Sequence, residues 1–163
     1  MTHNAPRNTI LLIEDNRDDE ELALRAFRKN NVANDIVVAR DGAEALHLLL
    51  GTAVPNEVNG TRKKLHPLIV LLDLKLPKID GLEVLRRIRS NRETALMPVV
   101  VLTTSSEERD ILESYRLGTN SYVRKPVDFA EFVETMRQLA SYWLHLNEPP
   151  PDIPSARNSP TLL

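Results

Sequence analysis

The segment Leu68-Ile69-Val70-Leu71-Leu72-Asp73 decides the fold of this chain. Five consecutive apolar residues of this kind are typical of a strand that is buried on both faces, as in a parallel sheet. The run ends in a carboxylate, and a loop from Leu74 to Gly81 follows it. Because parallel α/β folds bind their ligands at the carboxyl ends of the strands, we expect Asp73 to lie in a functional site.

Further short apolar runs alternate with longer amphipathic segments along the 163 residues. This alternation predicts an α/β fold built from βαβ units around a parallel sheet. The length supports one domain with a core of its own. Strands are predicted at 9–13, 35–39, 68–73, 98–103 and 120–124. Helices are predicted at about 17–30, 42–50, 81–90, 107–117 and 127–146.

The domain is predicted to span residues 8–146. Three segments do not follow the alternation, one at each end of the chain and one within the domain. Residues 1–7 are expected to form an N-terminal arm. Residues 51–67 are polar and rich in turn formers, so we expect a surface loop inserted between the second helix and the third strand. The segment 147–163 holds five of the eleven prolines, and we expect it to be a disordered tail.

The composition excludes several classes of function. The chain has no cysteine, so it holds neither disulfides nor thiolate metal sites, which fits a reducing cytoplasm. The formal net charge is −2 with both signs intermixed, so we expect no nucleic-acid partner. No apolar stretch approaches the length of a membrane span, so we expect no membrane partner and a cytoplasmic location.

Chemically useful residues stand where four of the predicted strands end. Glu14 and Asp15 follow the first strand, Asp73 ends the third, Thr103 ends the fourth and Lys125 follows the fifth. Because these ends meet at one edge of a parallel sheet, the side chains should converge. Two unit charges about 4 Å apart repel by about 4 kcal/mol at an effective dielectric constant of 20, and a hard divalent cation removes that cost.

The expected cation is Mg²⁺, which binds carboxylates, waters and phosphate oxygens. Asp15 and Asp73 would donate direct oxygens, Glu14 would act through water, and the backbone carbonyl of Lys75 would complete the protein ligands. Such a set predicts phosphoryl transfer, which needs an in-line nucleophile and charge neutralisation.

Asp73 is the best nucleophile, because the loop that follows leaves it accessible. Lys125 would pair with phosphoryl oxygens, and the Thr103 hydroxyl could hydrogen-bond one of them. Pro126, directly after the lysine, could hold a cis peptide bond that aims it, although most bonds before proline are trans.

Each of these residues also has an ordinary structural interpretation. Glu14 and Asp15 could be acids at a helix N-terminus, Thr103 could cap the next helix, and Lys125 could be solvated. The joint occurrence at four strand ends favours the functional interpretation.

The chain resembles a response-regulator receiver domain of two-component signalling over residues 8–146. The motifs that carry the resemblance are the acid pair Glu14-Asp15, Asp73, the loop Pro77-x-x-Asp80-Gly81, Thr103, Tyr122 and Lys125-Pro126. The resemblance implies a flavodoxin-like (βα)5 fold, a doubly wound parallel sheet with strand order 2-1-3-4-5. It also implies that Asp73 takes a phosphoryl group from a phosphohistidine of a sensor histidine kinase, with Mg²⁺ or, in its place, Mn²⁺.

Members of this family catalyse their own phosphorylation and autodephosphorylation, although they do not turn over a separate substrate. By the same resemblance, Thr103 and Tyr122 are switch residues that move inward on phosphorylation. The segment Ile10 to Asn16, the insertion at 51–67 and Tyr142-Trp143-Leu144 are further similar to small regulators paired with cyanobacterial phytochrome kinases. A light-regulated histidine kinase is then the expected partner.

A homodimer is expected through the fourth helix, the fifth strand and the fifth helix. The last predicted helix carries apolar residues on two stripes, whereas a helix that covers one side of a sheet needs only one. The surplus suggests an exposed patch suited to self-association. The interface candidates are Ile111, Tyr115, Phe132, Met136 and Trp143.

Two alternatives compete with the receiver interpretation. Phosphatase-type hydrolases that use a strand-end aspartyl nucleophile want a second aspartate two residues later, where this chain has Lys75. The other alternative is a non-phosphorylated receiver-fold interaction module. The intact set of Glu14, Asp15, Asp73, Thr103 and Lys125 argues against it.

Overall fold

The computed structural model describes residues 8–51 and 64–151. The predicted N-terminal arm, most of the predicted loop (52–63) and the tail beyond residue 151 lie outside the described residues. One five-stranded parallel sheet with strand order β2-β1-β3-β4-β5 forms the centre, as the resemblance implies. The strands are β1 (Thr9–Ile13), β2 (Asp35–Ala39), β3 (Ile69–Leu72), β4 (Val99–Thr103) and β5 (Ser121–Arg124).

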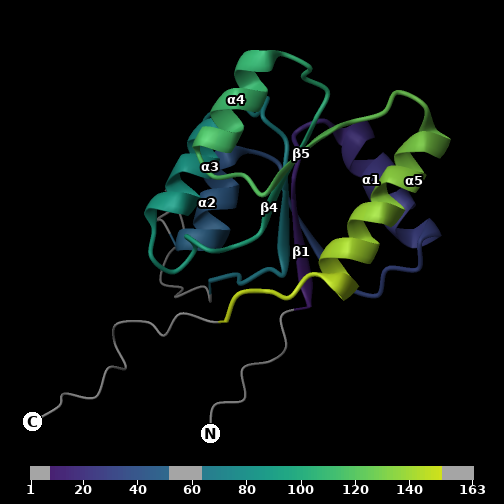
Figure 1. The fold of residues 1–163 in the computed structure, drawn as a ribbon, viewed down its shortest axis with the longest axis horizontal. Helices are drawn as coiled ribbons and strands as arrows, with labels where there is room; N and C mark the ends of the chain where they lie inside the picture. Colours follow the sequence, from purple (N-terminus) through teal and green to yellow (C-terminus); the bar gives the residue numbers. More distant parts are fainter. Residues whose placement is uncertain (1–7, 52–63, 152–163) are drawn as a thin grey trace, which may run out of the picture.

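Helices cover both faces of the sheet, so the domain has three layers (Figure 1). They are α1 (Arg17–Lys29), α2 (Gly42–Leu50), α3 (Gly81–Ser90), α4 (Glu108–Arg116) and α5 (Phe129–Ala140). Figure 1 shows α1 and α5 side by side on one face and α2, α3 and α4 on the other. Among the described helices, none combines the length and apolarity needed to cross a bilayer.

The three central strands are apolar except for Thr9 and Thr103 at their ends, because each faces a core on both sides. Every residue of β3 and β4 is buried, and β1 is buried from Ile10 onward. Successive side chains of a strand point to opposite faces, so Leu11 and Ile13 join the core under α2 and α3, whereas Ile10 and Leu12 join the core under α1 and α5. This double burial holds the strand ends rigidly, which is what a site at that edge requires.

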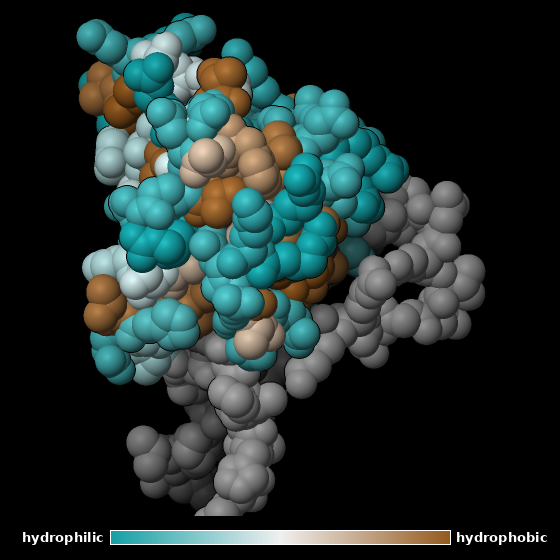
Figure 2. Space-filling model, turned by 90° about the vertical axis from the view of Figure 1, so that its right-hand side faces the viewer, coloured by the Kyte–Doolittle hydropathy of each residue, from teal (hydrophilic) through white to brown (hydrophobic). Residues whose placement is uncertain are grey.

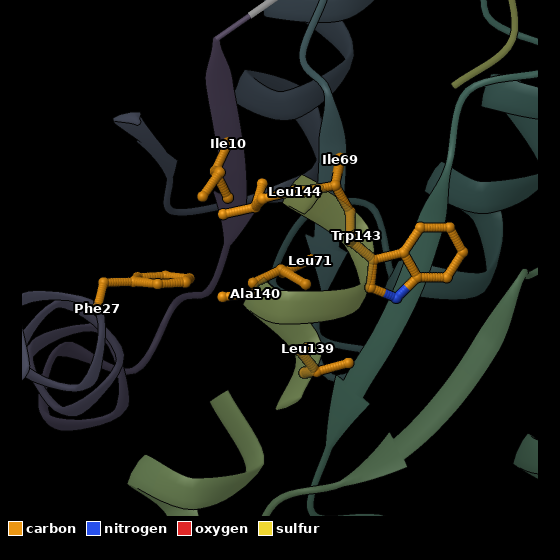
Figure 3. Close-up of a pocket in the computed structure, with 8 residues that line it drawn as sticks. All are labelled: Ile10, Phe27, Ile69, Leu71, Leu139, Ala140, Trp143 and Leu144. Carbon is orange, nitrogen blue, oxygen red and sulfur yellow. The ribbon is translucent and has the colours of Figure 1, made fainter. Parts of the chain in front are cut away.

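The predicted last helix divides into α5 and a following π-helix, η1 (Ser141–Leu146). The side chains of Trp143 and Leu144 in η1 line an apolar pocket together with Phe27 of α1 and Leu71 of β3 (Figure 3). Trp143 is therefore half-buried against the core and closes the end of the domain.

The predicted interface role of two α5 residues is wrong. Phe132 and Met136 are 6% and 0% exposed and belong to the core. The second apolar stripe exists because α5 packs against α1 as well as the sheet, with Val133 also packed against that core. Figure 2 shows the outer face of this helix pair, where hydrophobic atoms form separate patches among hydrophilic ones. Tyr115 on α4 remains exposed.

Candidate functional site

The carboxyl ends of β1 and β3 bring the acids together. Ile13 and Leu72 are paired in register as the last residues of these strands. The next backbone bonds continue the pattern, because the Asp73 N–H donates to the Ile13 carbonyl at 3.0 Å and the Glu14 N–H donates to the Ala39 carbonyl at 2.9 Å. Glu14 and Asp73 therefore stand one residue beyond the paired strand ends, with their backbones fixed by the sheet.

Three carboxylates form a group that fits a divalent cation. Glu14, Asp15 and Asp73 each offer one oxygen, and these oxygens lie within 4.8 Å of one another. Glu14 and Asp73 are buried, whereas Asp15 is exposed and gives the group an opening to solvent. Hard oxygen ligands with one open side suit a Mg²⁺-like ion, which keeps several waters.

Lys125 contacts two members of this acid group and one further carboxylate. Its ammonium donates to Asp73 Oδ2 at 3.1 Å, to Asp19 Oδ2 at 3.0 Å and to Glu14 Oε2. The Lys125 side chain is only 7% exposed, so its charge is compensated by protein carboxylates and not by bulk water. Its backbone N–H also donates to the Thr103 carbonyl at 2.7 Å, which fixes the root of the side chain to β4.

Burial and charge shift the pKa values of this pair. Burial raises the pKa of the Glu14 carboxyl to about 7, although the ammonium of Lys125 works in the opposite direction. Burial alone would lower the pKa of Lys125, but the carboxylates of Asp73 and Glu14 outweigh it and raise that pKa above its ordinary value. Lys125 is thus a permanent cation at physiological pH, whereas Glu14 titrates near neutrality.

The loop after Asp73 explains the Pro-x-x-Asp-Gly motif. The Asp80 side chain caps α3 by accepting from the Glu83 N–H at 2.9 Å. Gly81 follows because a Cβ there would lie 2.3 Å from the Asp73 carbonyl oxygen and 2.5 Å from the Leu74 Cα. The start of α3 therefore packs directly on the backbone that presents the Asp73 carboxylate.

The expected switch residues are linked through one loop. Thr103 is fully buried, and its hydroxyl accepts from the Ser105 N–H at 3.4 Å. The Tyr122 hydroxyl donates to the Ser105 carbonyl at 2.9 Å, and burial raises the pKa of that phenol. The Ser105 hydroxyl in turn donates to Asp110 in α4 at 2.6 Å. The β4–α4 loop thus connects the site edge to α4.

Two further predicted features have different outcomes. The peptide bond before Pro126 is trans, so the suggested cis bond is wrong. The aim of the lysine instead comes from its backbone bond to Thr103 and from its carboxylate partners. Lys75 lies beside the acceptor, since its N–H donates to Asp73 Oδ1 at 3.4 Å. Its carbonyl as a metal ligand stays a prediction.

Asp19 is the one contact of Lys125 that the sequence analysis missed. It lies in the first turn of α1, where Asn16 caps the helix by accepting from the Asp18 and Asp19 N–H groups. Three consecutive acids, Asp18, Asp19 and Glu20, are also what the dipole of a helix favours at its N-terminus. Asp19 differs from the acids beside it in its bond to Lys125, which lies 106 residues away in the sequence.

Comparison with known proteins agrees with this geometry. Residues 10–137 match the family model described as the response regulator receiver domain. The "Probable methanogenesis regulatory protein FilR2" of Methanothrix harundinacea is 40% identical over 141 residues, which cover 86% of each chain. The response regulator Rcp1 of Synechocystis is 34% identical over 139 residues, 85% of this chain and 90% of Rcp1.

Solved structures of response regulators also resemble this chain. The phosphorylated cyanobacterial phytochrome response regulator RcpA superposes with a TM-score of 0.77 at 36% identity, covering 89% of this chain and 99% of RcpA. The Mn²⁺-bound form of Rcp1 gives a TM-score of 0.76 at 32% identity, covering 88% and 99%. The bacteriophytochrome response regulator AtBRR gives 0.65 at 47% identity, covering 88% and 100%.

Proposed function

Because the chain belongs to the response regulator receiver family, we propose that it works in a phosphorelay by accepting a phosphoryl group on Asp73. The observation that carries this assignment is the Asp73 carboxylate, fixed at the end of β3 with Lys125 Nζ 3.1 Å from one oxygen. In the transfer, an Asp73 oxygen forms the new O–P bond as the N–P bond of a phosphohistidine breaks.

Each neighbouring group has a defined task in this proposal. Lys125 neutralises charge on the phosphoryl oxygens, for which a buried, permanently charged ammonium is suited. The Thr103 hydroxyl and the Tyr122 phenol are the switch groups, since both bond to the β4–α4 loop. Loss or exchange of those bonds would alter the surface around α4 and β5.

The divalent cation is proposed to be Mg²⁺, held by Asp15 and Asp73 directly and by Glu14 through water, with Mn²⁺ as a substitute. When bound, it would neutralise the charge that develops during phosphoryl transfer. The acid group in this chain supports the assignment, as does the Mn²⁺-bound form of Rcp1. The Lys75 carbonyl is the proposed backbone ligand.

We propose a phytochrome-type sensor histidine kinase as the phosphoryl donor. Support comes from the likeness to RcpA and AtBRR, which are described as response regulators of a phytochrome and a bacteriophytochrome. The competing donor is a histidine kinase of another pathway, because FilR2, at 40% identity, is described as a probable methanogenesis regulatory protein. Phosphotransfer from a purified phytochrome kinase under red and far-red light would decide between them, since a donor of this class transfers at light-dependent rates.

The test of the acceptor is an intact-mass spectrum after incubation with Mg²⁺ and acetyl phosphate. Wild type should gain one phosphoryl group, and neither Asp73→Asn nor an EDTA-treated sample should. Asp80→Asn is a matched control, because this carboxylate caps α3 beside the site without joining the acid group. Absence of any adduct on wild type, with both acetyl phosphate and a kinase, would favour the non-phosphorylated interaction module.

Homodimerisation through α4, β5 and α5 remains part of the proposal, with Ile111, Tyr115 and Trp143 as its remaining candidates. Leu112 and Tyr115 supply the support, because they are 50% and 52% exposed on α4. Sedimentation at tens of micromolar protein, roughly, with and without phosphorylation, tests it. A monomer under both conditions would exclude it. The cytoplasmic location likewise stays a prediction.

A further inference from the structure

Lys125 has one carboxylate partner that stands apart from the candidate metal ligands. An ammonium has three donors, and the structure gives each of them a carboxylate: Glu14, Asp73 and Asp19. Glu14 and Asp73 belong to the acid group that fits a cation, whereas Asp19 does not. Asp19 also comes from a helix, while the others come from strand ends.

A divalent cation and the lysine would therefore compete for the same carboxylate oxygens. A divalent cation on Glu14 and Asp73 would engage carboxylates that now neutralise the ammonium, and it would repel Lys125. The ammonium is too buried for water to replace those partners, because its side chain is 7% exposed. Asp19, 3.0 Å away and 33% exposed at its side chain, is the partner that such a cation would leave in place.

We infer that Asp19 is a positioning residue, which keeps Lys125 paired and in reach of the acceptor when a divalent cation engages Glu14 and Asp73. The inference rests on the proposed function for the identity of the acceptor and the cation. Asp19 acts through the lysine and touches neither of them. Removing its charge leaves lysine and cation to compete for two shared carboxylates, so cation binding weakens and phosphoryl acceptance slows.

Asp18 provides a matched control. It precedes Asp19 in the same helical turn, and Asn16 caps both backbone N–H groups, at 2.9 Å and 3.0 Å. Asp18 is exposed, and the Lys125 ammonium donates to Asp19 and not to Asp18. Asp18→Asn and Asp19→Asn therefore remove the same charge from the same turn, but only the second removes a partner of the lysine.

The experiment measures Mn²⁺ affinity by electron paramagnetic resonance of the free ion. Asp19→Asn should weaken binding about tenfold and Asp18→Asn about twofold, the latter as expected for an exposed charge. In a Lys125→Met background the Asp19→Asn effect should shrink to that of Asp18→Asn, because the competing cation is gone. Equal effects of the two substitutions in wild type, or an undiminished Asp19→Asn effect in Lys125→Met, would overturn the inference.

A second measurement needs no lysine variant. In EDTA, Asp19→Asn should lower the melting temperature by about 2–4 °C because a buried ammonium loses a partner, whereas Asp18→Asn, which loses only the interaction with the helix dipole, should lower it by less. If Asp19 were a metal ligand that only adds repulsion to the acid group, its removal would stabilise the metal-free protein instead, and the inference would fail.

The same preparations separate this inference from the proposed function. If wild type gains a phosphoryl group at Asp73 while Asp19→Asn behaves like Asp18→Asn in both measurements, only the role of Asp19 is wrong. If wild type binds Mn²⁺ with the predicted Asp19 dependence but accepts no phosphoryl group, the acceptor assignment fails and the positioning role stands. A wild type that binds no Mn²⁺ overturns the inference.

Discussion

Divalent cation binding at the acid group should depend on pH through Glu14. Burial raises the pKa of this carboxyl to about 7, and a cation needs the ionised form. With that pKa, about one tenth of the Glu14 carboxyls are ionised at pH 6 and about nine tenths at pH 8, so the affinity for Mg²⁺ should rise about tenfold over this interval. Isothermal titration calorimetry at about pH 6, 7 and 8 measures it directly.

Glu14→Gln is the decisive comparison, because the amide keeps the shape and cannot titrate. Its Mg²⁺ affinity should be weaker than that of wild type at pH 8 and nearly flat with pH. Equal pH dependence in the two proteins would show that another group controls binding. A wild-type affinity that does not change between pH 6 and 8 would refute the reasoning altogether, since it would mean that Glu14 is already ionised at the lower pH.

The metal-free protein should show the opposite pH dependence of stability. The folded pKa of Glu14 is raised above the unfolded value of 4.5, so a bound proton favours the native state. That contribution is complete below pH 4.5 and is lost as pH rises through about 7. The stability difference between wild type and Glu14→Gln in EDTA isolates it from the other acids. The stabilisation by added Mg²⁺ should therefore grow with pH.

Three further substitutions test the packing of the site and of the fold around it. Gly81→Ala places a Cβ 2.3 Å from the Asp73 carbonyl oxygen, so it should cost about 3 kcal/mol or more in urea unfolding and slow phosphorylation by acetyl phosphate; an unchanged rate would contradict the tight packing. Arg89→Met should cost about 3 kcal/mol, because its guanidinium donates to three carbonyls and a side-chain amide between 2.7 and 3.1 Å; a midpoint within error of wild type would argue otherwise. Tyr122→Phe removes the bond to the Ser105 carbonyl and should cost about 1 kcal/mol, while amide exchange in the β4–α4 loop rises.

The centre of the sheet was predictable because its three middle strands are buried on both faces. A strand with a core on each side is a largely apolar run; the predicted 68–73 exceeds β3 by one residue at each end, and the predicted 98–103 exceeds β4 by one residue at its start. The strand ends then placed Glu14 and Asp73 together without knowledge of any contact, because parallel strands share one carboxyl edge. The site is to this extent a consequence of topology.

Features that depend on which helices touch were not predictable. The double apolar stripe of α5 fits an exposed patch as well as a second buried face, and only its packing on α1 decides that Phe132 and Met136 are core. The change from α5 to a π-helix at Ser141 leaves no periodicity signal in six residues. The trans bond before Pro126 follows the general preference of such bonds, and no residue around it indicates an exception.

Asp19 matters for a further reason, which is the net charge of the site. When all of them are ionised, the four carboxylates of the site (Glu14, Asp15, Asp19 and Asp73) carry a formal charge of −3 together with Lys125, and two of them, Glu14 and Asp73, are buried. A divalent cation brings the four carboxylates and the lysine to −1. A site with Glu14, Asp15 and Asp73 alone would be neutral once the lysine and the cation were both in place, so the fourth acid is what leaves the loaded site with a net negative charge. Asp19 therefore sets the charge that the site offers to an incoming phosphoryl group, and its removal should make the cation, more than the phosphoryl group, the component that binds poorly.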